Sequence, residues 1–158
     1  MAQLDLPTGP VLLLALALTA CESTPVVPSP EGVFVRTNAT EYPVATPPHA
    51  ALVTVQNLTR GTVTVRRCLI NNSAIDPVGV DLVLEEEVRG AWQGEGLGFD
   101  CVAAGATRAD TVLARGEAAR VGRIIFTVPG RFRFRVGYGL GTNAAPTDTA
   151  TSPAFVFR

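Results

Sequence analysis

The stretch RFRFRV, residues 131–136, indicates the fold class of this chain. Its apolar residues Phe132, Phe134 and Val136 alternate with three arginines. Successive side chains of a β-strand point to opposite faces of the sheet, so the apolar residues share one face and the arginines share the other. Half-buried antiparallel strands have this pattern, whereas parallel strands buried on both faces are apolar throughout. The stretch therefore predicts an antiparallel strand with one face on a core and one face toward solvent.

The same alternation occurs elsewhere in the chain. Val80, Leu82 and Leu84 share a predicted face, with Asp81 and Glu85 opposite. From residue 33 onward, turn residues separate such runs at intervals of about eight to twelve positions, which suits a sandwich or a small barrel. Turn residues at 57–61 and 129–130 predict hairpins. We expect strands at 33–40, 50–58, 62–69, 80–88, 98–103, 118–128, 131–138 and 153–158, with a short one at 110–113.

Length and composition favour one all-β domain. A chain of 158 residues suits a single domain with a short appendage, and its richness in Val, Thr, Gly and Pro favours strands and turns. About seven to nine strands in residues 33–158 predict a single antiparallel immunoglobulin-like β-sandwich. The segment 113–117, the strand after it and residues 129–135 also resemble the last third of many bacterial extracellular immunoglobulin-like domains. That resemblance implies architecture only.

Residues 11–20, VLLLALALTA, form an uncharged and largely apolar run. A membrane-spanning helix needs about 20 such residues, whereas the hydrophobic region of a secretory signal is shorter. Leu18-Thr19-Ala20-Cys21 resembles the lipobox of bacterial lipoprotein precursors, whose pattern is Leu, two small residues and Cys. In that family the Cys thiol receives a diacylglycerol, and the signal is cut just before the Cys. The resemblance implies that Cys21 is the lipid-bearing first residue of the mature protein.

The chain is therefore expected to have three parts. Residues 1–20 are a lipoprotein signal peptide, residues 21–32 are the lipid-anchor Cys with a Pro-rich tether, and residues 33–158 are the folded domain. The protein is then attached to a bacterial membrane through the lipid on Cys21, in the cell envelope, facing the periplasm or the cell exterior. Because the first ten residues contain no Lys or Arg, an ordinary secretory signal and an apolar amino-terminal strand stay open as alternatives.

Two cysteines remain in the folded domain, Cys68 and Cys101. An exported domain with one such pair is expected to join them, because the compartment is oxidising. Two separate buried thiols are the alternative, and two cysteines without a neighbouring His make an incomplete metal site. Val63 and Val65 share a face that would place Cys68 on the opposite one. Only a bulge near residues 66–67 would remove that conflict, and the sequence does not decide whether one is present.

Residue types that carry catalysis are scarce. The single histidine, His49, follows two prolines, as is typical of a surface loop. The run 85–87 holds three glutamates, but neighbours on a strand point to opposite faces, so we expect the polar end of an edge strand. We therefore expect no catalytic residue, no metal, no cofactor and no enzymatic activity. With 13 basic and 14 acidic residues, the chain lacks the excess positive charge of a general nucleic-acid binder.

The stripe Arg131, Arg133 and Arg135 is the strongest candidate for binding. Guanidinium groups on one strand face can contact the phosphate or carboxylate groups of an anionic envelope polymer or protein partner. The alternative is a solvated face on which these arginines pair across strands with acids such as Glu85 and Glu87.

The aromatic residues Trp92 and Tyr138 suggest a second candidate. Either ring would serve as a stacking platform in a carbohydrate-binding module of the envelope, although a core position beside the disulfide is the alternative for Trp92. The leading hypothesis is a non-enzymatic, lipid-anchored envelope protein that acts as a binding or structural module.

Overall fold

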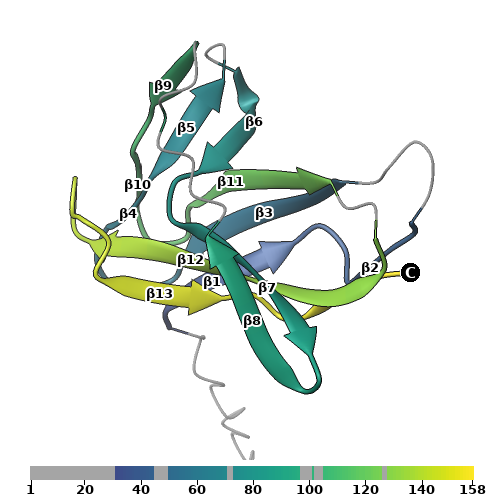
Figure 1. The fold of residues 1–158 in the computed structure, drawn as a ribbon. Coiled ribbons are helices and arrows are strands. Elements are labelled where there is room, and N and C mark those ends of the chain that lie inside the picture. Colours follow the sequence, from purple (N-terminus) through teal and green to yellow (C-terminus); the bar gives the residue numbers. More distant parts are fainter. Residues whose placement is uncertain (1–30, 45–49, 71–72, 97–100, 102–104, 126–127) are drawn as a thin grey trace, which may run out of the picture.

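The computed structural model describes residues 31–44, 50–70, 73–96, 101, 105–125 and 128–158. Within these residues the regular secondary structure is β-strand, and no helix occurs among them. The fourteen strands of this described part form three sheets. Two of the sheets make up the body of the molecule, and the third extends from it at the top of Figure 1. The all-β fold class predicted from the sequence is confirmed.

The first sheet has three antiparallel strands in the order β1-β3-β11. Its central strand alternates strictly between buried and half-buried residues, as expected for a strand with one face on a core. The bounds of its strands are β1 Val33–Thr37, β3 Ala50–Asn57 and β11 Ala118–Ile125.

The large sheet has eight strands and is organised around β12 (Gly130–Leu140), which pairs with β4, β7, β13 and β14. A hairpin of β7 and β8 extends it on one side (Figure 1). Its pairs are antiparallel except that of β14 with β2. The other strands are β2 Glu41–Tyr42, β4 Val63–Val65, β7 Leu82–Val88, β8 Ala91–Gly96, β10 Thr111–Leu113, β13 Asp148–Thr151 and β14 Phe155–Phe157.

The small sheet at the top of Figure 1 has the order β6-β5-β9. Its strands are β5 Arg67–Ile70, β6 Ser73–Gly79 and β9 Ala106–Arg108. Cys68 of β5 forms a disulfide with Cys101, with their Cα atoms 5.7 Å apart. The disulfide predicted from the cysteine count is therefore present in the structure, and it ties the small sheet to the segment before β9.

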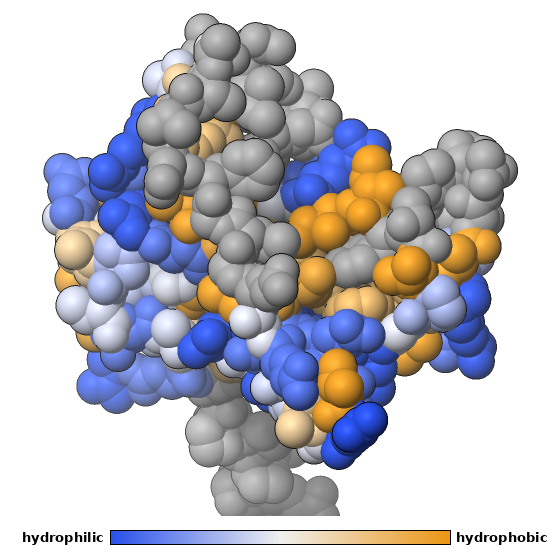
Figure 2. Space-filling view, in the orientation of Figure 1, coloured by the Kyte–Doolittle hydropathy of each residue, from blue (hydrophilic) through white to orange (hydrophobic). Residues whose placement is uncertain are grey.

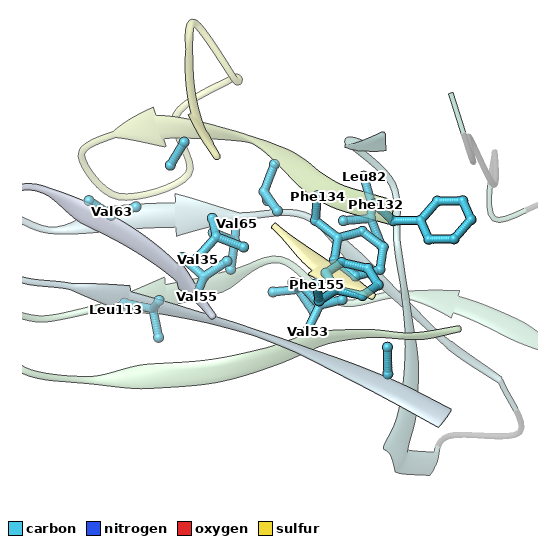
Figure 3. Packing of buried hydrophobic residues seen from close by; sticks show 14 of the residues in the cluster. Val35, Val53, Val55, Val63, Val65, Leu82, Leu113, Phe132, Phe134 and Phe155 are labelled. Atoms are coloured by element: carbon cyan, nitrogen blue, oxygen red, sulfur yellow. The ribbon is translucent and has the colours of Figure 1, made fainter. Parts of the chain in front are cut away.

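The hydrophobic core lies between the first sheet and the large sheet. Phe132, Phe134 and Val136 of β12 are all buried, so the alternation in residues 131–136 points its apolar residues inward as predicted. Phe134 stacks on Phe155 with ring centroids 5.0 Å apart, and Figure 3 shows these rings beside Val53 of the opposite sheet. Both layers therefore contribute to one core.

Among the described residues, the fully buried polar side chains are Asn57 and Thr64. Asn57, at the end of β3, has 0% of its surface exposed. Its Nδ2 donates to the carbonyls of Gly61 and Leu113 at 2.8 and 2.9 Å. Its Oδ1 accepts from the backbone N of Thr59 at 2.8 Å and from the Thr59 hydroxyl at 2.7 Å. Every donor and acceptor of the amide therefore has a partner, which offsets the cost of burying it. These bonds link the turn after β3 to the end of β10.

The two hairpins predicted from turn residues are wrong. Residues 57–61 lead from β3 in the first sheet to β4 in the large sheet, and residues 129–130 lie at the start of β12 in the large sheet, whereas β11 belongs to the first sheet. In each case the two strands do not pair with each other, and they belong to different layers. The reason is that the apolar faces of the joined strands cover a common core from opposite sides.

The predicted strand at 62–69 is divided into two. β4 ends at Val65 in the large sheet and β5 begins at Arg67 in the small sheet, so the chain leaves one sheet for another at Arg66. This break resolves the conflict over faces that the sequence left open, although it is a change of sheet and not a bulge within one strand. It allows Val63, Val65 and Cys68 all to be buried.

The sequence did not predict β2, β6, β8, β9 or β13. It also placed the glutamate run of residues 85–87 on an edge strand, whereas β7 is an interior strand between β12 and β8. The predicted signal peptide, Cys21, His49, most of the predicted tether and most of the strand expected at 98–103 lie outside the described residues.

Candidate functional site

The outward face of β12, β7 and β8 carries the predicted arginine stripe. The register places Arg133 across from Glu85 and Arg135 across from Val83. On the other side of β7, Glu87 lies across from Trp92 and Glu85 lies across from Gly94. The face therefore joins residues from 83 to 135 that are far apart in sequence. We call Arg131, Arg133, Arg135, Glu85, Glu87 and Trp92 the arginine face.

Ion pairs connect all three arginines of this face to glutamates. Arg131 pairs with Glu87, and Nε of Arg133 donates to Oε2 of Glu85 at 2.6 Å. Nε of Arg135 lies 3.3 Å from Oε1 of the same glutamate. The pairing of the stripe with Glu85 and Glu87, which the sequence offered as one of two interpretations, is therefore present in the structure.

Trp92 lies under two of these guanidinium groups. The Cζ atoms of Arg133 and Arg131 are 4.3 and 5.6 Å from the centroid of its ring. A Cβ atom added at Gly94 would lie 2.8 Å from Cγ of Glu85, so the glycine leaves the space that the glutamate occupies. Cation–π contacts and ion pairs are thus combined in one cluster, in which Glu85 is only 7% exposed.

The interpretation of Trp92 as a core residue beside the disulfide is wrong. Trp92 is half-buried on β8 of the large sheet, whereas Cys68 is on β5 of the small sheet. Gly90 and Gly94 flank the tryptophan, a composition that is typical of a loop. The structure instead has a hairpin, and Arg89 and Gly90 adopt positive φ angles of 53° and 80° at its turn.

Tyr138, the other predicted stacking residue, points to the opposite side of β12. It packs partly buried against the hydrophobic core. Burial, and then the nearby carboxylate of Asp148, raise the pKa of the Tyr138 phenol above its ordinary value. The structure does not bring Tyr138 together with Trp92 or with the arginine face.

A groove runs along the large sheet beside Arg135. It has a volume of about 450 Å³ and is bordered by the turn before β7, by β12 and by the segment that leads into β13. Its polar lining residues are Asp81, Arg135, Thr147, Asp148 and Thr149. Asp81 is already engaged, because Nε of Arg66 donates to its Oδ2 at 2.6 Å. The sequence carried no signal for this groove, since its walls are distant in the chain and meet only in the folded sheet.

The exposed apolar residues lie elsewhere. Val44, Ile125, Val128 and Leu140 are each more than a third exposed, and hydrophobic colour gathers around the end of β11 in Figure 2. Val44, Ile125 and Val128 border residues outside the described ranges, so we assign no site to them.

Neither a cluster of metal-binding side chains nor a membrane-spanning helix occurs within the described ranges. They hold no group of three or more His, Cys, Asp or Glu side chains that is placed to bind a metal ion. This part of the chain also has no apolar helix of membrane-spanning length.

No protein-family model matches the chain, and no curated protein matches it. The candidate site is therefore defined by its own residues. Of the three arginines predicted to contact an anion, Arg131 and Arg133 are held by a glutamate and by Trp92. Arg135 borders the groove described above.

Proposed function

We propose that this chain is a non-enzymatic, lipid-anchored protein of the bacterial cell envelope and that it binds an envelope polymer or protein partner through its arginine face. The lipobox-like sequence at residues 18–21 supports anchoring through lipid on Cys21. The disulfide between Cys68 and Cys101 is compatible with an oxidising compartment outside the cytoplasm.

For the domain itself we propose an immunoglobulin-like β-sandwich over residues 33–158. Two layers of mainly antiparallel strands around one core support this subclass. The crossovers at residues 57–61 and 129–130 support it as well, because sandwich connections pass between layers.

One observation carries the binding proposal. Arg135 has 45% of its side chain exposed, and its ion pair with Glu85 has an N–O distance of 3.3 Å, against 2.6 Å for Arg133. A single glutamate thus serves two arginines, and Arg135 is the more distant of them. A guanidinium held in this way is available to an external carboxylate or phosphate.

Carbohydrate stacking on Trp92 is a second candidate, and the outward position of the ring on β8 favours it. The guanidinium of Arg133 covers one face of the indole, so a sugar would have to use the remaining face or displace the arginine. A soluble oligosaccharide that stacks on Trp92 should change its fluorescence, which comes from the only tryptophan of the chain. An unchanged emission would remove this candidate.

The proposal is tested by retention on cell-wall material from a bacterial envelope, using the full chain in detergent. Joint substitution of Arg131, Arg133 and Arg135 by alanine should abolish retention. The matched control replaces three exposed arginines elsewhere, Arg36, Arg60 and Arg115. A second triple variant with lysines keeps the charges if the alanine variant fails to fold. Retention equal to wild type in both triple variants of the stripe would exclude the arginine face as the binding surface.

A further inference from the structure

The groove beside Arg135 is built from three segments that the large sheet brings together. Val83 and Arg135 lie across from each other on β7 and β12, and Thr149 of β13 lies across from Gly137 of β12. Gly137 has no side chain, and a Cβ atom there would lie 2.9 Å from Cβ of Asp81 and 3.4 Å from Cβ of Pro146. The two walls of the groove, at Asp81 and at Pro146, therefore both lie close to Gly137. Arg135 lies two residues before Gly137 on the same strand.

The guanidinium of Arg135 has spare hydrogen-bonding capacity at this groove. Its contact with Glu85 uses Nε. Its two terminal nitrogens form no hydrogen bond with a residue in the described ranges. Those nitrogens form one edge of the planar group, and this geometry matches the two oxygens of a carboxylate or phosphate.

The other residues that line the groove restrict the class of ligand that it can bind. Asp81 and Asp148 also border the groove, so a phosphate dianion would meet more repulsion there than a carboxylate monoanion. Thr147 and Thr149 supply hydroxyl groups, while Val80, Leu82, Val83 and Pro146 supply apolar surface. A ring with hydroxyl groups, an apolar face and one carboxylate matches all of these.

We propose that this groove binds an acidic saccharide of the uronic acid type, with the sugar carboxylate held by the terminal nitrogens of Arg135. The sugar hydroxyls face the threonines, and its C–H face lies on the apolar wall. The volume of about 450 Å³ is within the usual range for small-ligand sites, about 300–1,000 Å³. This inference rests on the proposed binding function and specifies its ligand class and its principal residue.

The test is isothermal titration calorimetry of the full chain in detergent with trigalacturonic acid. Its methyl ester is the matched ligand, because esterification removes the negative charge and keeps the sugar ring. We expect the acid to bind and the ester to bind at least about tenfold more weakly, the loss typical of a charge-assisted hydrogen bond. Equal affinity for the acid and the ester, or no binding of either, would overturn the inference.

Variants locate the site. Arg135→Gln should weaken binding of the acid by about tenfold or more, and Arg135→Lys should restore only part of it, because lysine keeps the charge without the paired nitrogens. Arg36→Gln, which changes an exposed arginine on β1, is the control and should bind as wild type. Equal affinity of Arg135→Gln and Arg36→Gln for the acid would overturn the assignment. It would also be overturned if inorganic phosphate bound the wild-type chain as tightly as trigalacturonic acid and displaced it.

Failure of the ligand assignment can be distinguished from failure of the proposed envelope-binding function. If the chain is retained on cell-wall material but does not bind trigalacturonic acid, only the proposed ligand class is wrong. A chain that binds trigalacturonic acid but is not retained contradicts the envelope function and leaves the groove assignment standing.

Discussion

Glu85 lies directly across from Arg133 in the register of β7 and β12, and its Oε2 accepts a hydrogen bond of 2.6 Å from Nε of the arginine. The glutamate is only 7% exposed, although it projects from the outer side of the sheet. Arg133 and Arg135 both contact its carboxylate, and the ring of Trp92 lies under Arg133. The outer face of the sheet thus has a small polar cluster of its own, distinct from the hydrophobic core.

The first prediction concerns the stability of this cluster. Glu85→Ala leaves Arg133 and Arg135 without their shared partner, so the free energy of unfolding should fall by about 1–3 kcal/mol. Urea denaturation measures the change. Glu86→Ala is the control, because the neighbouring glutamate is exposed and points to the other face of β7. Equal effects of the two substitutions would show that Glu85 contributes no more than a surface residue.

The single tryptophan reports on the contact with Arg133. Removing the guanidinium in Arg133→Ala should expose one face of the indole and increase quenching of its fluorescence by acrylamide. Arg36→Ala, on a strand of the first sheet, should leave quenching unchanged. If Arg133→Ala and Arg36→Ala gave the same quenching constant, the stacked arrangement would be wrong.

Asn57 should be among the most sensitive polar positions of the chain. Asn57→Ala removes the side-chain partners of Gly61, Leu113 and Thr59 within the core, so we expect a loss of about 2–4 kcal/mol in the free energy of unfolding. Thermal or urea unfolding gives the value. Gln56→Ala, one residue earlier and half-buried, should cost less than half as much. A similar cost at both positions would contradict the linking role of Asn57.

The disulfide should make a separate contribution to stability. Cys68 and Cys101 are 33 positions apart, and reducing a bridge of that span should lower the free energy of unfolding by roughly 3–4 kcal/mol in the chain-entropy account. Denaturant curves with and without reductant measure this difference. Thiol titration of the oxidised, denatured protein that found both cysteines free would refute the bridge.

The free energy of unfolding should decline at alkaline pH because of Tyr138. Its pKa is raised in the folded state, first by burial and then by Asp148, so the folded chain holds the phenolic proton more tightly than the unfolded chain does. The resulting stabilisation is complete below the ordinary pKa of 10.0 and is lost as pH rises through the raised folded value.

Absorbance titration of the phenolate checks this behaviour, with Tyr138→Phe subtracted to isolate the residue. Asp148→Asn should move the Tyr138 titration toward lower pH, because it removes the negative charge but leaves the burial. A titration that is identical in wild type and Asp148→Asn would show that the carboxylate has no influence on the phenol.

The fold class could be predicted because alternation is a local signal. Phe132, Phe134 and Val136 point inward as their spacing requires, and the cysteines pair as their number suggests. The missed strand β8 shows the limit of that signal. Its sequence, AWQGEG, contains two glycines and no apolar alternation, and it is a strand because β7 offers a free edge and residues 89–90 turn the chain back.

The candidate site could be predicted only in part. The pairing of Arg131, Arg133 and Arg135 with Glu85 and Glu87 follows from residue types, but the unequal sharing of Glu85 depends on three-dimensional register. The same is true of the position of Trp92 under Arg133, because Gly94 makes the necessary space only when β7 and β8 are paired. The groove depends on the register in which Thr149 of β13 and Val83 of β7 pair with β12. The local sequence carries no signal for that register.

We propose that this is a lipid-anchored protein of the cell envelope, and mass spectrometry of the chain isolated from a bacterial membrane fraction tests this claim most directly. We predict a mature amino terminus at Cys21 that carries a diacylglyceryl group on its sulfur. A mature chain that starts at any other residue, or an unmodified Cys21 thiol, would contradict the claim.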